Sequence, residues 1–404
     1  MLQWSLPRIR SRRTWVLVLL LGLLTVVAGC FLWAESHLRA ARLALERRAY
    51  AEAQAHLTCY RRVWPRSPTA HLLAARCARG LGDLDEAERL LAGCPRRGTD
   101  SEALALERSL LHAQRGTLDP AREELLWRWV EQQHPETPQI LEALALGCIY
   151  TQRLGEAMTC LERWFAYAPG DSQALYLRGL VWEGMGALQK AGEDYHQAVR
   201  HDPEHTQARQ RLAEYLLSAS EYQEAAALFE QLLQRQPHDA TSQLGLAKCR
   251  RLQGEITEAE HLLDDPLIHD SPSVAALVER ASLAQEKQEF DAAEKWFRQA
   301  LAQDPFDRDA CHGLARCLRA LERPTEAETY EARRAQIERD LERLAELCEQ
   351  MGKNPNDAGL PYQAGLICLR NGQKAEARRW FRNVLQRQPE HEGARQGLEE
   401  LVRQ

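Results

Sequence analysis

Lysine, asparagine, aromatic residues and β-branched residues are all scarce in this chain of 404 residues. Only six of its 52 basic residues are lysines, so arginine supplies nearly all the positive charge. Aromatic residues make up 7% of the chain, and Val, Ile and Thr are sparse, which disfavours a β-sheet. Ala, Leu, Arg, Glu and Gln dominate instead, and all are good helix formers. The composition therefore predicts an all-α protein, and its arginine bias is typical of a GC-rich, bacterial genome.

The chain also lacks a strong charge of either sign and any recognisable catalytic motif. Its net charge is −6, with 27% charged and 45% hydrophobic residues, which is the balance of a folded protein. A pI near 6.2 argues against the positive field that nucleic acids require. HExxH, paired CxxC, phosphate-loop, nucleophile-elbow and Rossmann patterns do not occur. We expect no catalytic residues, cofactor, metal or nucleic-acid partner, and we interpret the histidine-bearing segment 201–205 as a turn.

One long hydrophobic run, from Trp15 to Trp33, contains no charge. As a helix it would span roughly 28 Å, close to the thickness of the bilayer core. Arginines precede it at positions 8, 10, 12 and 13, which favours a cytoplasmic N-terminus, although those at 39, 42, 47 and 48 weaken the asymmetry. We expect a basic segment at 1–14, a single-pass signal anchor at 15–33 and the remainder of the chain on the extracytoplasmic side.

Two processing alternatives to this anchor remain open. The segment 27–30 (VAGC) is similar to a bacterial lipobox, in which Cys30 would be lipidated and become the new N-terminus. The apolar run continues for three residues beyond Cys30, which a spanning helix explains better. The segment 11–15 (SRRTW) is also a partial twin-arginine match. Each of these routes attaches the protein to a membrane.

Downstream of the apolar run, a pattern recurs with a step of about 34 residues. In the copy at 172–205, its eighth, fifteenth, twentieth, twenty-fourth, twenty-seventh and thirty-second slots hold Gly179, Gly186, Ala191, Tyr195, Ala198 and Pro203. Similar residues fill these slots in about ten copies between residues 34 and 391. This spacing closely resembles the tetratricopeptide repeat.

The resemblance implies an α-solenoid, a right-handed superhelix of about ten antiparallel helical hairpins over 34–391. Small residues in the eighth and twentieth slots let the two helices cross closely, and glycine in the fifteenth permits the turn between them. Aromatic residues in the twenty-fourth slot fill the groove to the next repeat, and proline in the thirty-second ends the second helix. One hairpin cannot bury its apolar face alone, so neighbours must stack.

Several segments depart from the regular pattern. Pro120 and Pro324 fall at helix starts, where proline is tolerated. Pro266 should stop a second helix near Asp264 and make 265–273 a loop and a candidate hinge. Residues 325–352 contain no proline and, until position 352, no glycine, which predicts one extended helix, either a dimerisation seam or an outer helix capping a groove. Residues 392–404 should form the terminal capping helix.

The eleven cysteines do not form a recognisable disulfide pattern. Five of them occupy the tenth or eleventh slot of first helices, where a small apolar side chain is wanted, so we interpret them as core residues. If any pair is oxidised, Cys148 and Cys160 are the best placed, because they face each other across one hairpin. This many thiols fits a reducing compartment somewhat better than the extracytoplasmic side.

The resemblance also implies where a ligand would bind. In this family the first helices line a concave groove and contact ligands through their second, fifth, ninth, twelfth and thirteenth slots. Carried onto this chain, these slots predict an apolar-aromatic half that leads into a basic half, suited to an extended peptide with an acidic end. The main candidates are Tyr150, Tyr176, Gln210, Glu214, Lys248, Arg251, Arg316 and Arg319.

These observations predict a non-catalytic scaffold in the bacterial cell envelope that binds protein or peptide partners in its groove. The alternative is an accessory subunit of an envelope polysaccharide synthesis or export system. Aromatic side chains in the groove would favour the polysaccharide alternative, whereas the basic half favours acidic peptides.

Overall fold

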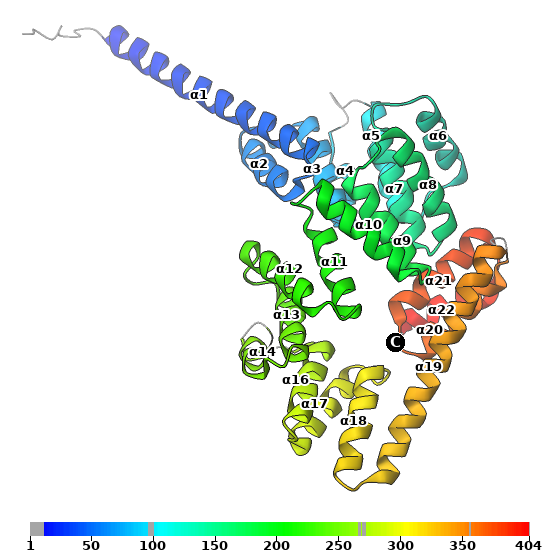
Figure 1. Ribbon diagram of the computed structural model, residues 1–404. Helices are drawn as coiled ribbons and strands as arrows, with labels where there is room; N and C mark the ends of the chain where they lie inside the picture. Colours follow the sequence, from blue (N-terminus) through cyan, green and yellow to red (C-terminus); the bar gives the residue numbers. More distant parts are fainter. Residues whose placement is uncertain (1–11, 96–100, 266–267, 269–271, 355–356, 404) are drawn as a thin grey trace, which may run out of the picture. The chain divides into compact units, whose positions relative to one another are not determined.

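The computed structural model describes residues 12–95, 101–265, 268, 272–354 and 357–403. All the regular secondary structure in those ranges is helical, and the helices follow one another as antiparallel hairpins (Figure 1). The chain divides into two compact units, Met1–Gln132 and Gln133–Gln404. The expected all-α solenoid of helical hairpins is therefore confirmed.

The first unit contains three hairpins in its described residues. Its helices are α1 (Arg12–Glu46), α2 (Tyr50–Val63), α3 (Pro68–Gly80), α4 (Leu84–Ala92), α5 (Ser101–Gln114) and α6 (Pro120–Glu131). Much of the basic segment expected at 1–14 lies outside the described residues.

The second unit contains seven hairpins in its described residues, followed by a single helix, α22. The first four hairpins are α7 (Thr137–Tyr150) with α8 (Leu154–Tyr167), α9 (Ser172–Gly184) with α10 (Leu188–His201), α11 (Thr206–Ser218) with α12 (Tyr222–Arg235), and α13 (Ala240–Leu252) with α14 (Ile256–Leu263). The remaining helices are α16 (Val274–Glu286), α17 (Phe290–Gln303), α18 (Arg308–Ala320), α19 (Pro324–Lys353), α20 (Gly359–Arg370), α21 (Lys374–Arg387) and α22 (Glu392–Arg403).

The first helices of successive repeats begin at side-chain caps spaced by the repeat length. Asp171, Asp239, Ser273 and Asp307 each accept a hydrogen bond from a backbone N–H in the first turn of the helix that follows. Such a cap satisfies one of the donors that a helix N-terminus leaves free. At the same position His205 caps α11 through Nδ1, so its proton lies on Nε2, which bonds to Gln173.

The turn inside each hairpin requires a left-handed backbone at the fifteenth slot. All ten hairpins have positive φ there, between 56° and 84°. Five of them use glycine, as the sequence pattern predicts, and five place another residue in this conformation. The non-glycine residues are Arg48, Gln152, Ser220, Gln288 and Glu322. A side chain with a Cβ atom is disfavoured here by about 1–2 kcal/mol.

We therefore expect the Gln288→Gly substitution to stabilise the second unit by about 0.5–1 kcal/mol. The exposed Gln288 has φ of 63°, and relief of this strain should exceed the entropy that a glycine costs. The opening free energy of α16 and α17, measured by amide hydrogen exchange, reports the change. Gln288→Ala is the control, because it keeps the Cβ atom. Equal stability of the two variants would rule out backbone strain as the cause.

Aromatic side chains in the twenty-fourth slot fill space left by glycines. A Cβ atom on Gly179 would lie 2.3 Å from the ring of Tyr195 in the same repeat, and one on Gly313 would lie 2.1 Å from the ring of Phe297 in the preceding repeat. Both rings are almost fully buried. The expected packing of these aromatics against the next repeat is thus seen directly at Phe297.

Helix α1 runs from the apolar run into the first hairpin without a break. The stretch Leu19–Glu46 is long and apolar enough to cross a membrane, and an N-terminal signal sequence would share these properties. Beyond Trp33 the helix packs on α2 through Ala34, Leu38 and Ala41, all buried. No spacer separates the apolar run from the hairpin.

Several segments of the structure depart from the regular repeat. Pro120 and Pro324 lie in the first turns of α6 and α19. Helix α14 ends at Leu263, and most of the loop expected at 265–273 falls outside the described residues. The extended helix expected at 325–352 corresponds to α19. Its first half packs with α16–α18, whereas its second half packs with α20–α22, so this one helix joins two hydrophobic clusters.

Candidate functional site

The candidate groove is built from the first helices of successive repeats in the second unit. Helix α11 contacts α13, α13 contacts α16, and α16 contacts α18. Equivalent slots on these helices therefore lie in rows across neighbouring repeats, as the sequence pattern requires. The contacts of each candidate side chain decide whether it remains available to a ligand.

Three candidates, Tyr176, Gln210 and Glu214, meet in one polar cluster. The half-buried Gln210 and its neighbour Arg211 both donate hydrogen bonds to Glu214, over 3.1 and 3.2 Å. Arg211 also lies 3.7 Å from Glu183, which accepts a bond from Tyr195. Burial raises the pKa of the Tyr176 phenol, whose ring lies at a tilt beside that of Tyr195, with the ring centroids 6.2 Å apart. This cluster links α9 to α11, and its one arginine faces two carboxylates, so it offers no free cation.

Two basic candidates, Lys248 and Arg316, make no hydrogen bond or ion pair within the described part of the chain. Both occupy the ninth slot of their first helices, α13 and α18. Lys248 is half-buried and Arg316 is exposed. The nearby Arg316 guanidinium contributes, after burial and Arg334, to holding the pKa of His312 below its ordinary value. An unpaired cation on a helix of the candidate groove is free to contact an anionic group.

The other two basic candidates are engaged within the protein. Arg251 donates from Nε to Glu279 over 2.5 Å and from Nη1 to Glu286 over 2.5 Å. Its partner Glu279 is 3% exposed, so this pair ties α13 to α16 in the interior of the array. Arg319 is paired with Glu331 of α19 at 2.6 Å. Both charges are neutralised before any ligand arrives.

The aromatic candidate Tyr150 contacts a helix more than 200 residues away. Its hydroxyl oxygen lies 2.7 Å from Nη1 of Arg382 on α21, and the Arg379 guanidinium covers its ring at 5.3 Å. The adjacent Thr151 carbonyl accepts a 2.8 Å bond from Asn383, and both residues are buried. Tyr150 therefore joins the α7–α8 turn to α21.

Family models for the tetratricopeptide repeat match the chain over most of the described hairpins. One model matches residues 36–110 and 216–281, and a second matches 185–230 and 278–342. Together they cover more than half of the chain. The chain belongs to the tetratricopeptide-repeat family. A search of curated proteins finds no match to it.

Several solved structures are similar to this chain at low sequence identity. A repeat protein from Parabacteroides merdae is 17% identical, with 71% of this chain and 99% of that chain covered and a TM-score of 0.37. A repeat protein from Thermus thermophilus is 21% identical, covering 45% and 98%, with a TM-score of 0.36. The pilF protein of Pseudomonas aeruginosa is 15% identical, covering 60% and 94%, with a TM-score of 0.40.

The sequence did not predict the buried ion pairs that join the first helices of neighbouring repeats in this tetratricopeptide-repeat chain. In the first unit, Glu107 on α5 accepts bonds from Arg76 and Arg79 on α3, over 2.6 and 3.1 Å. Arg79 and Arg251 each precede their glutamate partner by 28 residues. An inward-facing glutamate with an arginine 28 positions upstream was therefore the available signal.

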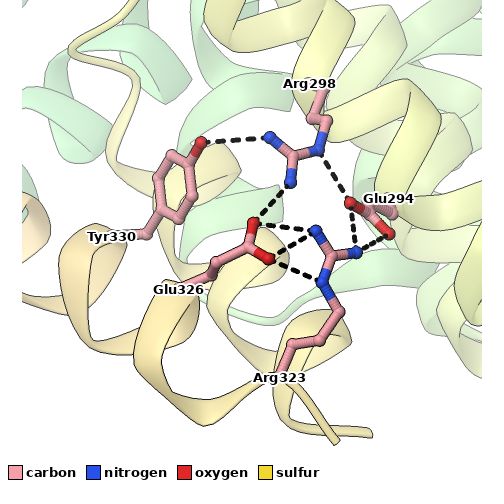
Figure 2. Close-up of polar contacts among 5 residues, drawn as sticks. All are labelled: Glu294, Arg298, Arg323, Glu326 and Tyr330. Atoms are coloured by element: carbon pink, nitrogen blue, oxygen red, sulfur yellow. Dashed lines mark hydrogen bonds and ion pairs between the residues drawn. The ribbon is translucent and has the colours of Figure 1, made fainter. Parts of the chain in front are cut away.

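Second helices of neighbouring repeats carry a separate network of charges. Figure 2 shows Arg298 and Arg323 enclosed between Glu294 and Glu326, with Tyr330 beside Arg298. Arg323 lies 2.9 Å from both oxygens of Glu294 and 2.7 Å from an oxygen of Glu326. Burial would raise the pKa of Glu294, but bonds from Arg298 and Arg323 hold it below its ordinary value. The network ties α17 to α19 and leaves no free cation.

All eleven cysteines, each in the described part of the protein, are free thiols. Cys148 and Cys160 face each other inside the α7–α8 hairpin, where their hydrogen bond and burial raise the pKa of the Cys160 thiol. Most of the others are buried, as expected of cysteines used for packing. Among the described residues, no group of three or more metal-ligating side chains is present.

Proposed function

We propose that this protein is a non-catalytic, membrane-anchored scaffold that binds extended, acidic segments of partner proteins along α13, α16 and α18. The observation that carries the proposal is the pair of unpaired cations, Lys248 and Arg316, in the same slot of repeats that lie two steps apart. Ser282 occupies that slot between them and adds no charge. Arg251 and Arg319 are paired with glutamates, so they contribute no free charge, and Lys248 and Arg316 carry the unpaired positive charge of the site.

The spacing of the two cations suggests what a ligand must carry. Packed helices lie about 8–10 Å apart, so two steps along the first helices amount to roughly 20 Å. An extended peptide advances about 3.3 Å per residue. Two carboxylates about six residues apart would therefore meet Lys248 and Arg316 together.

Binding of synthetic peptides to the full chain in nanodiscs tests this proposal. Each peptide carries two glutamates in a neutral extended background, at the spacing of about six residues or at a shorter or longer one. The six-residue spacing should bind tightest. Lys248→Glu with Arg316→Glu should weaken binding by at least about tenfold, because each attraction becomes a repulsion.

Lys295→Glu is the matched control for each single reversal, Lys248→Glu or Arg316→Glu, because each changes the net charge by the same amount. Lys295 is exposed on the second helix α17 and makes no hydrogen bond or ion pair in the described residues. If the control weakens binding as much as the Lys248 and Arg316 changes, or if spacing has no effect, attraction is only generic and the groove assignment is wrong.

The anchoring part of the proposal rests on the apolar stretch of α1. We propose that it spans the membrane with the N-terminus in the cytoplasm and the solenoid outside. The lipoprotein alternative would place an acyl group on Cys30, which is exposed on the same helix. The mass of the mature chain separates the two, since lipidation at Cys30 removes everything before it.

The polysaccharide alternative depends on aromatic side chains that are free to stack on sugars. Tyr150 is covered by Arg379 and Arg382, and Tyr176 packs against Tyr195 and His205. These contacts favour a protein ligand as the first candidate. Binding of an anionic polysaccharide in place of the peptides, with the same dependence on Lys248 and Arg316, would reverse that order.

A further inference from the structure

The end of the first hairpin that lies beside the apolar run carries a surface of aromatic and basic side chains. Helix α2 runs antiparallel to α1, so its C-terminal end returns to the level at which the apolar run stops. There the ring of Trp64 lies 5.0 Å from the ring of Phe31, inside the apolar run. Packing against α2 begins at Ala34, three residues later. The C-terminal end of α2 therefore lies level with Trp33 along the axis of α1.

This height coincides with the headgroup layer if α1 spans the bilayer. The headgroup regions add roughly 5–8 Å on each side of the hydrocarbon core. Trp33 and Trp64 are 44% and 41% exposed, respectively. Amphipathic aromatic rings at both positions are typical of a membrane interface.

Three arginines surround Trp64, at positions 61, 62 and 66. Arg62 and Arg66 are exposed and Arg61 is half-buried. None of the three makes a hydrogen bond or ion pair in the described residues, although most other arginines of the first unit do. Each lies within three residues of Trp64, which places the charges near headgroup depth. The chemistry that complements unpaired guanidinium groups at that depth is a phosphate-bearing, anionic lipid headgroup.

We propose that the segment 61–67, with Trp64 at its centre, is a docking surface for anionic lipid headgroups that fixes the first hairpin onto the bilayer. This inference rests on the proposed membrane anchoring of α1. The first hairpin then contacts the bilayer at two places, through the spanning part of α1 and through the C-terminal end of α2. The charge of the surrounding leaflet then regulates how firmly the base of the solenoid is held.

Hydrogen exchange of the full chain in nanodiscs tests this inference. Discs of phosphatidylcholine alone are compared with discs that also contain phosphatidylglycerol. Each arginine near an anionic leaflet favours the docked state by roughly fivefold. Amides of 61–67 should therefore exchange at least about tenfold more slowly in the anionic discs. Replacing all three arginines with glutamine should remove this difference, and raising the salt concentration should reduce it.

The control removes three other arginines from the same unit. Arg89, Arg122 and Arg128 are each paired with a carboxylate on their own helix or cap. Replacing these three with glutamine changes the net charge by the same amount as replacing the three arginines around Trp64. This variant should keep the lipid dependence. Unchanged exchange within α3 verifies that either variant is folded.

Different outcomes overturn different statements. Equal exchange of 61–67 in both kinds of disc would overturn the lipid surface while leaving the anchor intact. Protection that appears only when a disc holds two copies would assign the surface to self-association instead. Release of the full chain from membranes by alkaline carbonate would overturn the anchoring and, with it, the headgroup surface.

Discussion

Replacing Glu107 with alanine is expected to destabilise the region from α3 to α5 by about 3–5 kcal/mol. Glu107 is 1% exposed and accepts hydrogen bonds from Arg76 and Arg79. The Arg79 side chain is itself only 6% exposed. Without the carboxylate it would be a buried charge with no compensating partner. Local opening free energies from hydrogen exchange on the full chain in micelles measure the loss.

Two further variants separate this mechanism from simple loss of packing. Glu107→Leu combined with Arg79→Leu should recover most of the stability, because apolar groups of similar volume can replace a buried ion pair. Glu124→Ala breaks an exposed pair with Arg128 and should cost less than about 0.5 kcal/mol. If the double variant is no more stable than Glu107→Ala, the uncompensated charge is not the cause.

The same carboxylate gives the first unit a defined acid sensitivity. Burial would raise the pKa of Glu107, but Arg79 and Arg76 together hold it below its ordinary value of 4.5. A group with a lowered folded-state pKa contributes stability above its unfolded pKa and loses that contribution as the pH falls through the folded value. Stability of α3–α5 should thus change little from pH 7 to 5 and fall below about pH 4.5. The Glu107→Ala variant should show a smaller fall.

The hairpins could be predicted because each depends on residues close together in sequence. A glycine such as Gly313 and the ring of Phe297 lie 16 residues apart, so their complementarity recurs at a fixed spacing that the pattern reveals. The positive φ at the fifteenth slot is equally local. It is forced by the turn, and even Arg48 and Gln152 adopt it without being glycine.

The state of each groove residue was harder to predict because it depends on partners in other repeats. Arg251 occupies a slot predicted to bind ligand, yet its partner Glu279 lies in the next repeat and faces inward. Tyr150 meets Arg382, which is 232 residues away and obeys no repeat rule. Slot position therefore indicates which face a residue lies on, whereas its pairing decides whether it can bind a ligand.

Phe297→Ala should strongly destabilise the second unit, with a cost of about 3–5 kcal/mol. The ring is 1% exposed and fills the space above Gly313, where even a methyl group would lie 2.1 Å from it. Because each repeat contacts mainly its neighbours, the loss should be confined to α16–α19 and absent from α9. Hydrogen exchange resolved by segment measures both.

Gly313→Ala provides the reciprocal test of the same contact. Overpacking against the ring should cost about 1–3 kcal/mol in the wild type. Combined with Phe297→Leu, which shortens the opposing side chain, it should cost less than the sum of the two single changes. Gly155→Ala is the control, since nothing lies within 4 Å of a Cβ atom there, and it should be neutral or stabilising by up to about 1 kcal/mol. Strict additivity of the Phe297 and Gly313 changes would contradict direct packing between them.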